Sequence, residues 1–211
     1  MVVGLNMLKE GGGDAFVSAG STGALLSAAT LTVRRVKGIR RAAMAPQIPT
    51  KTGREAVLID CGATADCTPE FLLQFAFMGS YYAEKVLGIE NPRVALLNIG
   101  AEDSKGGELQ KAVYPLLKQA GEAGAINFTG NIEARDVPLG GADVVVADGF
   151  SGNILLKGIE GTALFMASMM KDMFKKNVLT KLAALLCMDG VKAFKKKMDY
   201  RETGGTALIG L

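Results

Sequence analysis

The sequence of 211 residues contains no histidine. A Ser-His-Asp triad, a Cys-His pair, a histidine-ligated zinc ion and a histidine general base are therefore excluded within this chain. Any catalysis by these residues has to use lysine, arginine, aspartate, glutamate, asparagine, serine, threonine or the backbone amides.

Cysteines and long apolar runs are also scarce. The three cysteines are an odd number without paired spacing, which favours a reducing compartment over a disulfide framework. No histidine activates Cys61 or Cys67, so buried packing is their simpler interpretation, and their spacing does not fit a zinc site. We expect no metal and no cofactor. The longest apolar stretches are shorter than the roughly 20 residues that span a bilayer.

The two ends of the chain carry further expectations. The first residues, MVVGLNMLKEGG, predict a short amphipathic helix and lack the basic segment and cleavage site of a signal peptide. We therefore expect a cytoplasmic protein. The chain ends at GGTALIGL, where a strand has just begun, so we expect a fragment of a longer protein or a naturally short version of one.

The composition is that of a folded chain, with 49% hydrophobic and 21% charged residues. At this length we expect a single domain, residues 1–211. The net charge of +3 does not indicate a nucleic-acid partner.

Strand-like apolar runs at 14–18, 55–60, 93–99, 125–130 and 142–148 alternate with helical patterns at about 21–36, 69–87, 107–121 and 152–176. This alternation predicts an α/β fold with a mainly parallel sheet flanked by helices.

Two glycine-containing turns resemble each other. The segments AGSTGALL (19–26) and DGFSGNILL (148–156) share Gly-x-Ser/Thr-Gly followed by a helix. In each, the first glycine can take a positive φ, the hydroxyl can cap the helix, and the second glycine admits close approach of a ligand. Open N–H groups and the positive end of the helix dipole would attract an anion. The candidate phosphate-binding residues are Gly20, Ser21, Thr22, Gly23, Gly149, Ser151 and Gly152. The alternative is that small residues simply pack a helix against its strand.

Polar residues also follow the other predicted strands. Because ligands of open α/β sheets bind beyond the carboxyl ends of the strands, we expect these residues to meet at one edge. The candidate donors to phosphate and to an oxyanion are Asn98, Lys105, Asn131, Asn153 and Lys157; further site candidates are Asp60, Glu102, Glu133 and Asp148. Arg135 can clamp phosphate or pair with Glu133 or Asp136. Taken singly, such charges are usually solvated or capping residues, and Lys157 can simply be exposed.

The C-terminal part predicts a protruding amphipathic helical hairpin over residues 164–198. Four methionines at 166, 169, 170 and 173 form a helical stripe that is typical of a core or a dimer interface. An apolar tip, LAALLCM (182–188), follows between lysines. This pattern suits an anionic membrane surface, an acidic protein partner or packing on a partner subunit. The candidate contact residues are Leu182, Leu185, Leu186, Lys192, Lys195 and Lys196.

Four segments in this order, SAGSTGAL, NIGAEDSKG, GNIEARD and DGFSGNILLK, resemble the phosphate acyltransferase family of bacterial phospholipid synthesis. The resemblance covers nearly the whole chain. It implies transfer of a fatty acyl group from acyl carrier protein to inorganic phosphate, which gives acyl phosphate. It also implies a three-layer α/β/α fold like those of phosphotransacetylases and isocitrate dehydrogenase-like proteins, a homodimer, and peripheral association with the inner face of the membrane, where a membrane acyltransferase takes the product.

The sequence departs from the family at three places. Segments like DAMGGD near the start and PVxxxHG near the end of the family pattern are absent here, and Thr64 stands where the family has asparagine.

The implied chemistry is compatible with a chain that lacks histidine. Phosphate, with a second pKa of about 6, is largely dianionic near neutral pH and attacks a thioester with little help from a base. A thiolate whose thiol has a pKa of about 8.5 leaves with little help from an acid. The protein has to hold phosphate and stabilise the oxyanion. Alternatives are the same transfer from a coenzyme A thioester, and a non-enzymatic phosphate-binding or membrane-surface module.

Overall fold

The computed structural model describes residues 1–198 and 205–211, with the side chains of all of these except 195–198. The contacts within the chain group into two units. One unit comprises Met1–Asn153 and Thr206–Leu211, and the other comprises Ile154–Gly205. The organisation as a single domain stays a prediction.

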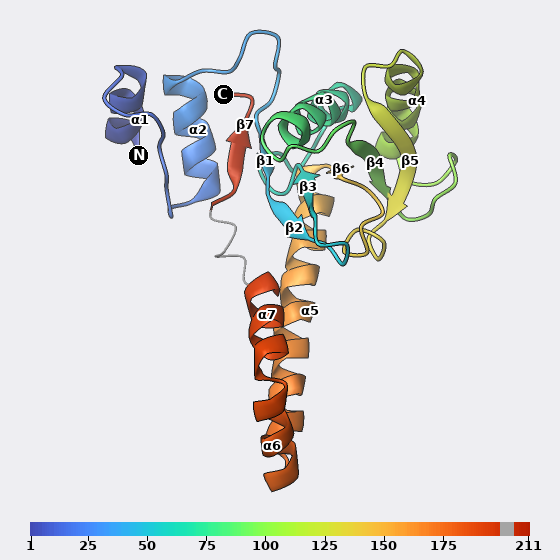
Figure 1. Cartoon of the computed structure of the whole chain (residues 1–211). Helices are drawn as coiled ribbons and strands as arrows, with labels where there is room; N and C mark the ends of the chain where they lie inside the picture. Colours follow the sequence, from blue (N-terminus) through green and yellow to red (C-terminus); the bar gives the residue numbers. More distant parts are fainter. Residues whose placement is uncertain (199–204) are drawn as a thin grey trace. The chain divides into compact units, whose positions relative to one another are not determined.

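A five-stranded sheet forms the centre of the first unit (Figure 1). Its strands, in spatial order, are β2 (Gln47–Pro49), β3 (Glu55–Ile59), β6 (Val144–Val146), β4 (Arg93–Asn98) and β5 (Asn127–Glu133). The last four are mutually parallel, whereas β2 runs antiparallel to β3. The predicted α/β fold with a mainly parallel sheet is therefore confirmed.

The central strands are continuous apolar runs because both of their faces are covered. All three residues of β6 are fully buried, as are Val57, Leu58 and Ile59 of β3. The helices α3 (Pro69–Lys85) and α4 (Glu108–Glu122) contact each other, and α3 also contacts β3, β4 and β6. Together they bury one face of the sheet with side chains such as Phe75 and Leu117.

The rest of the first unit differs in part from the predicted elements. The helices α1 (Val2–Lys9) and α2 (Thr22–Thr32) contact each other, and β1 (Ala43–Ala45) pairs antiparallel with β7 (Ala207–Ile209) at the end of the chain. The predicted strand at 14–18 is wrong, since this segment has no regular structure and Val17 is 87% exposed. A strand needs a neighbouring strand for its backbone hydrogen bonds, and this segment has none among the described residues.

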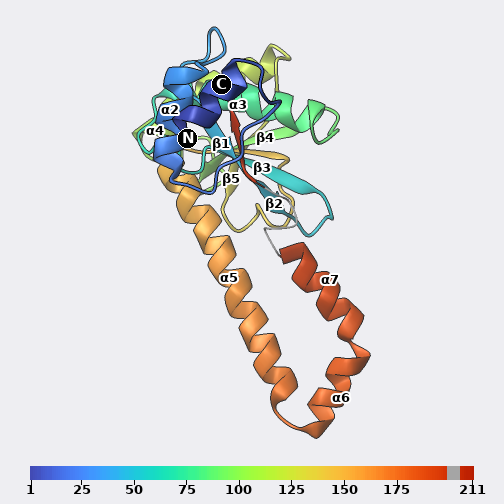
Figure 2. The same cartoon turned by 90° about the vertical axis from the view of Figure 1, so that its left-hand side faces the viewer.

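The second unit contains most of α5 (Gly149–Lys175), then α6 (Val178–Leu186) and α7 (Met188–Met198). Figure 2 shows the chain reversing direction between α5 and α6. A reciprocal cap stabilises this reversal, because Thr180 N donates to Asn177 Oδ1 (2.9 Å) and Asn177 N donates to Thr180 Oγ1 (3.0 Å). The predicted apolar tip, 182–188, is instead part of α6 and its junction with α7.

The side chains of Leu182, Leu185, Leu186 and Lys192 in this unit are exposed. Those of Lys195 and Lys196 lie outside the described residues, and the contact role predicted for all six residues stays a prediction. Across residues 1–198 and 205–211, no helix has both the length and the apolar character that crossing a membrane requires.

Candidate functional site

The register of the sheet brings the ends of its four parallel strands to one edge, here called the carboxyl edge. Ile59 of β3 and Leu96 of β4 both align with Val146 of β6. Asn98 and Asp148 each follow these aligned residues by two positions, and Asn98 aligns with Glu133 of β5. Because ligands of open α/β sheets bind at this edge, it is the place to look for a site.

Asp60, directly after β3, organises the backbone of the carboxyl edge. Its side chain is fully buried and accepts hydrogen bonds from the N–H groups of Met44, Cys61, Ala63 and Thr64 at 2.7–3.2 Å. Burial raises the pKa of Asp60, and the four N–H groups oppose that rise. Asp60 thus links β1 to the loop after β3 by hydrogen bonds, and this role is structural.

The start of α5 already uses its N–H groups within the chain. Asp148 precedes the helix, and its Oδ1 accepts a hydrogen bond from Ser151 N (2.8 Å) while its carbonyl accepts one from Gly152 N (2.9 Å). Gly149 N donates to the carbonyl of Thr64 (2.9 Å). The carboxylate of Asp148 therefore caps the helix, whereas the sequence pattern predicted a hydroxyl cap. Three of the first four N–H groups of the helix already have hydrogen-bond partners.

Close backbone packing explains the two glycines of this turn. A Cβ atom on Gly152 would lie 1.9 Å from the carbonyl oxygen of Asp60, and one on Gly149 would lie 2.5 Å from that of Thr64. The predicted positive φ is wrong, since neither Gly149 nor Gly20 has one. At this turn the alternative interpretation, small residues that pack a helix start against a strand end, describes the geometry.

The turn at 20–23 has different surroundings. Its residues are exposed, Gly20 N donates to Ser18 Oγ (3.1 Å), and Ser21 precedes α2 without a hydrogen bond from its side chain to the helix, against the predicted hydroxyl cap. A Cβ atom on Gly23 would meet nothing within 4 Å. Among the described residues, the N–H groups of Thr22 and Gly23 have no hydrogen-bond partner. This turn keeps the open amides that binding an anion requires.

Two asparagine amides hold the loop after β4, residues 99–107. Asn98 is nearly buried, and it donates from Nδ2 to the carbonyl of Lys105 (3.1 Å) and accepts from Ile99 N (2.8 Å). Asn131 of β5 donates from Nδ2 to the carbonyl of Glu102 (2.8 Å). Both amides predicted as donors to substrate are thus bonded to this loop. They position the loop that carries Lys105.

A tyrosine that the sequence did not single out anchors the same loop. Tyr114 of α4 donates its hydroxyl to Asp103 Oδ1 (2.6 Å), and Lys118 lies 3.8 Å from the other carboxylate oxygen. Burial, together with the hydrogen bond to Asp103, raises the pKa of Tyr114 to about 12. Asp103 lies in the loop and Tyr114 in the helix that follows it, and no local sequence pattern links the two residues. Only the packing of α4 shows this contact.

The cations of the carboxyl edge make exposed ion pairs. Arg135 pairs with Glu133 (3.2 Å) and lies 3.8 Å from Asp136. This pairing with carboxylates is the alternative that the sequence left open beside a phosphate clamp. Lys105 Nζ lies 4.0 Å from Glu102. Exposed pairs of this kind contribute little free energy, so either cation can leave its partner for a stronger anion.

Two further predicted donors lie on α5. Asn153 is exposed, and a Cβ atom on Gly62, in the loop after β3, would lie 3.9 Å from its Cγ. Lys157 belongs to the second unit and pairs with Glu160 at 2.8 Å. The structure thus places Asn153 beside the loop that carries Asp60, and it leaves Lys157 as an exposed ion-paired residue.

Two buried polar atoms at this edge have no hydrogen-bond partner among the described residues: Thr64 Oγ1 and Asn131 Oδ1. Buried polar atoms are normally satisfied, so both are positions for a ligand or a water molecule. Cys67 donates its thiol to the carbonyl of Thr64 (3.3 Å), and burial raises its pKa to about 11. The thiol is therefore protonated at neutral pH and a poor nucleophile, in line with the packing interpretation.

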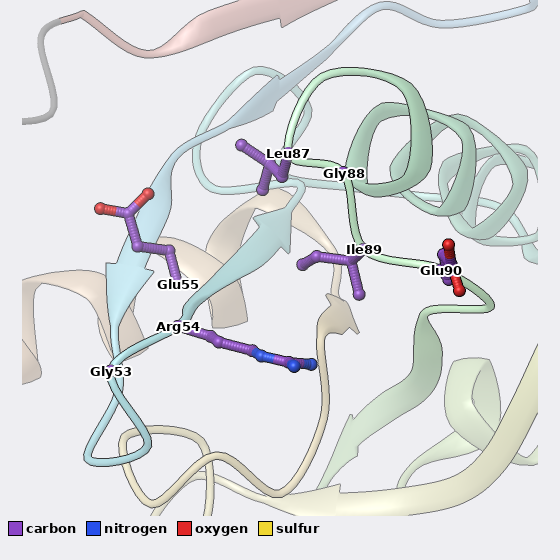
Figure 3. A pocket seen from close by; sticks show the side chains of 7 residues that line it. All are labelled: Gly53, Arg54, Glu55, Leu87, Gly88, Ile89 and Glu90. Carbon is purple, nitrogen blue, oxygen red and sulfur yellow. The ribbon is translucent and has the colours of Figure 1, made fainter.

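A surface pocket of about 660 Å³ lies at the opposite, amino edge of the sheet (Figure 3). It lies between the β2–β3 turn and the loop after α3, and its lining residues are Gly53, Arg54, Glu55, Leu87, Gly88, Ile89 and Glu90. In Figure 3 the side chains of Leu87 and Ile89 point toward β3, and Arg54 extends beneath them. None of the predicted site residues lines it.

A model of the family described as fatty acid synthesis protein matches residues 1–211. The chain belongs to this family. Proteins named phosphate acyltransferase from Thermoanaerobacterium thermosaccharolyticum, Alkaliphilus oremlandii and Bacillus cereus are 51%, 53% and 52% identical to it over all 211 residues. The chain spans 62–63% of the length of these curated relatives.

Solved structures support the fold of this family member. A phosphotransacetylase from Streptococcus pyogenes aligns with 77% of the chain and 55% of its own length, at a TM-score of 0.59 and 21% identity. A branched-chain phosphotransacylase from Enterococcus faecalis aligns with 75% of the chain and 62% of its own length, at a TM-score of 0.56 and 18% identity. At these identities the likeness concerns the fold alone.

Proposed function

We propose that this chain carries out the reaction of a phosphate acyltransferase, in which a fatty acyl group moves from acyl carrier protein to inorganic phosphate. The observation that carries the proposal is the identity of 51–53% with proteins of that name over the whole chain. A carboxyl edge rich in amides and exposed cations, in a chain without histidine, supports a reaction that depends on binding anions.

In the proposed reaction an oxygen of phosphate attacks the carbonyl carbon of the thioester. The carbon–sulfur bond then breaks, the thiolate leaves and takes a proton from solvent, and acyl phosphate forms. Because phosphate is largely dianionic near neutral pH, the protein's task is to position it and to stabilise the oxyanion. We assign phosphate to the turn at Gly20–Gly23, because the N–H groups of Thr22 and Gly23 have no hydrogen-bond partner among the described residues. Lys105 and Asn153 stay candidate donors to the oxyanion, a role that requires them to reach the same carbonyl carbon as the bound phosphate.

The turn at Gly149–Gly152 receives a different role in this proposal. Its N–H groups are largely bonded within the chain, so it holds the loop after β3 in place and does not itself bind phosphate. Homodimer formation, and contact of the α6–α7 segment with the membrane surface and a membrane acyltransferase, remain part of the proposal. The exposed apolar side chains of α6 support them.

A trapping assay tests the reaction and its donor. The full chain is incubated with phosphate and either long-chain acyl carrier protein or long-chain acyl-coenzyme A, and acyl phosphate is captured with hydroxylamine. We expect product from the carrier protein. Product from neither donor would refute enzymatic activity for this chain, and product from coenzyme A alone would assign it to the phosphotransacetylase type.

Gly20→Val tests the assignment of phosphate. A side chain at Gly20 would meet Met1 Cε, the flexible end of a side chain, at 2.4 Å, so the fold should tolerate it. We expect loss of phosphate-dependent turnover with an unchanged circular dichroism spectrum. Gly13→Val, a change in the same exposed segment, is the matched control because the nearest atom to its Cβ is 4.0 Å away. Equal turnover in the two variants would refute the assignment.

A further inference from the structure

The connection between α2 and β1 is strongly basic. Residues 34–41, RRVKGIRR, contain five cations in eight residues, and all five side chains are exposed. The net charge of the whole chain is only +3, so positive charge is concentrated here. We call residues 34–41 the basic segment.

Contacts with α3 and the chain end hold the backbone of the basic segment in place. The side-chain amide of Gln74 in α3 forms two hydrogen bonds with this backbone. Its Nε2 donates to the carbonyl of Gly38 (3.0 Å), and its Oε1 accepts from Arg40 N (2.8 Å). Val36 N donates to the carbonyl of Gly210 (3.2 Å). The charges therefore stand on an anchored backbone, which suits oriented recognition better than a free tail does.

Most of this charge is not neutralised. Arg40 pairs with Glu70, and Arg41 lies over the ring of Phe71, with the guanidinium carbon 5.7 Å from the ring centroid. Among the described residues, Arg34 and Lys37 have neither an ion pair nor a hydrogen bond from the side chain. Unpaired cations on a fixed backbone produce a positive potential that attracts acidic partners.

The basic segment leads directly to the carboxyl edge. Arg41 contacts Phe71 in the first turn of α3, and Met44, three residues later, donates its N–H to Asp60 Oδ1 (2.9 Å). Asp60 in turn organises the loop that contacts the start of α5. A macromolecule seated on the basic segment would thus lie beside the strand ends where the reaction is proposed.

We propose that the basic segment is the docking surface for the acidic acyl carrier protein, an inference that rests on the proposed function. Acyl carrier proteins are strongly acidic and present the thioester on a flexible arm, so they must dock close to the reacting groups. Charge complementarity supplies the attraction and orients the carrier. An anionic membrane is the other partner of fitting charge, and the test below separates the two.

The test changes Arg34 and Lys37, whose side chains form no ion pair or hydrogen bond with the described residues. In Arg34→Gln/Lys37→Gln we expect the KM for palmitoyl-acyl carrier protein to rise about tenfold, because rim charges act on encounter and binding. Its kcat, and the KM for phosphate, should stay unchanged. The rise should shrink at high salt, which screens exposed charges. Lys51→Gln/Lys111→Gln removes two other exposed lysines and serves as the matched control.

Direct binding completes the test. The wild type and both double variants are titrated with palmitoyl-acyl carrier protein and with vesicles containing an anionic phospholipid. Weakened carrier binding in the Arg34/Lys37 variant alone supports the proposal. Equal carrier binding in both variants, with normal turnover, overturns the docking surface and leaves the proposed function standing. Selective loss of vesicle binding assigns the segment to the membrane. A wild type that neither binds nor uses the carrier overturns both proposals.

Discussion

Two turns with one sequence pattern, Gly20–Gly23 before α2 and Gly149–Gly152 before α5, differ in almost every physical respect. The turn before α5 is packed against the loop after β3. A Cβ atom on either of its glycines would lie closer than van der Waals distance to a backbone carbonyl oxygen, and most of its N–H groups are hydrogen-bonded within the chain. The turn before α2 is exposed, and a Cβ atom on its Gly23 would face open space. Among the residues that the structure describes, the N–H groups of Thr22 and Gly23 have no hydrogen-bond partner.

The comparison teaches that a glycine pattern before a helix does not by itself identify an anion site. Open amides are needed to bind a phosphate, and amides already paired with the protein's own carbonyl and carboxylate groups are not available. The buried turn therefore stabilises the fold, and the exposed turn is free to bind a ligand. Substitutions at matched positions of the two turns test this division.

The largest effect is expected for Gly152→Ala. The new methyl group would overlap the carbonyl oxygen of Asp60, and backbone on both sides of the contact prevents relaxation. We expect the free energy of unfolding to fall by about 3 kcal/mol or more, the upper end for overpacking. Urea unfolding followed by circular dichroism measures it. A loss below about 1 kcal/mol would show that this turn is as open as the first.

A smaller effect is expected for Asp148→Ala, which removes the cap from Ser151 N. The free energy of unfolding should fall by about 1 kcal/mol, the usual loss for a helix cap, and Asp148→Asn should restore most of it. The matched change, Ser21→Ala, should alter it by less than about 0.5 kcal/mol because Ser21 makes no such bond. Equal losses at the two positions would contradict the division between the turns.

The smallest effect is expected for Gly23→Ala, the counterpart of Gly152→Ala. The methyl group would point into open space within α2, so the free energy of unfolding should rise by about 0.5 kcal/mol through the better helix propensity of alanine. A strongly destabilised variant would mean that Gly23 is packed as tightly as Gly152.

Patterns along the chain predicted much of the sheet. The strands β3, β4 and β6 were predicted because their buried apolar runs are continuous, and α3, α4 and α5 followed from helical periodicity. The strand at 14–18 was wrong, and β1 and β2 were missed, since three-residue strands carry too little periodicity and depend on a distant neighbour. The meeting of Asp60, Asn98 and Asp148 at one edge of the sheet could be predicted, because it requires only that the strands before them be parallel. The alternation of strands and helices along the chain implies such a parallel sheet.

The sequence by itself determined the class of fold, the absence of imidazole chemistry, the polar strand ends and the basic segment, because each depends on residue identity or on local periodicity. The tertiary structure alone decided which of two similar turns keeps its amides open, and that Asn98, Asn131 and Tyr114 hold a loop. These outcomes depend on which backbone groups meet across the fold, and hydrogen bonds between residues far apart in the chain leave no periodic trace in the sequence.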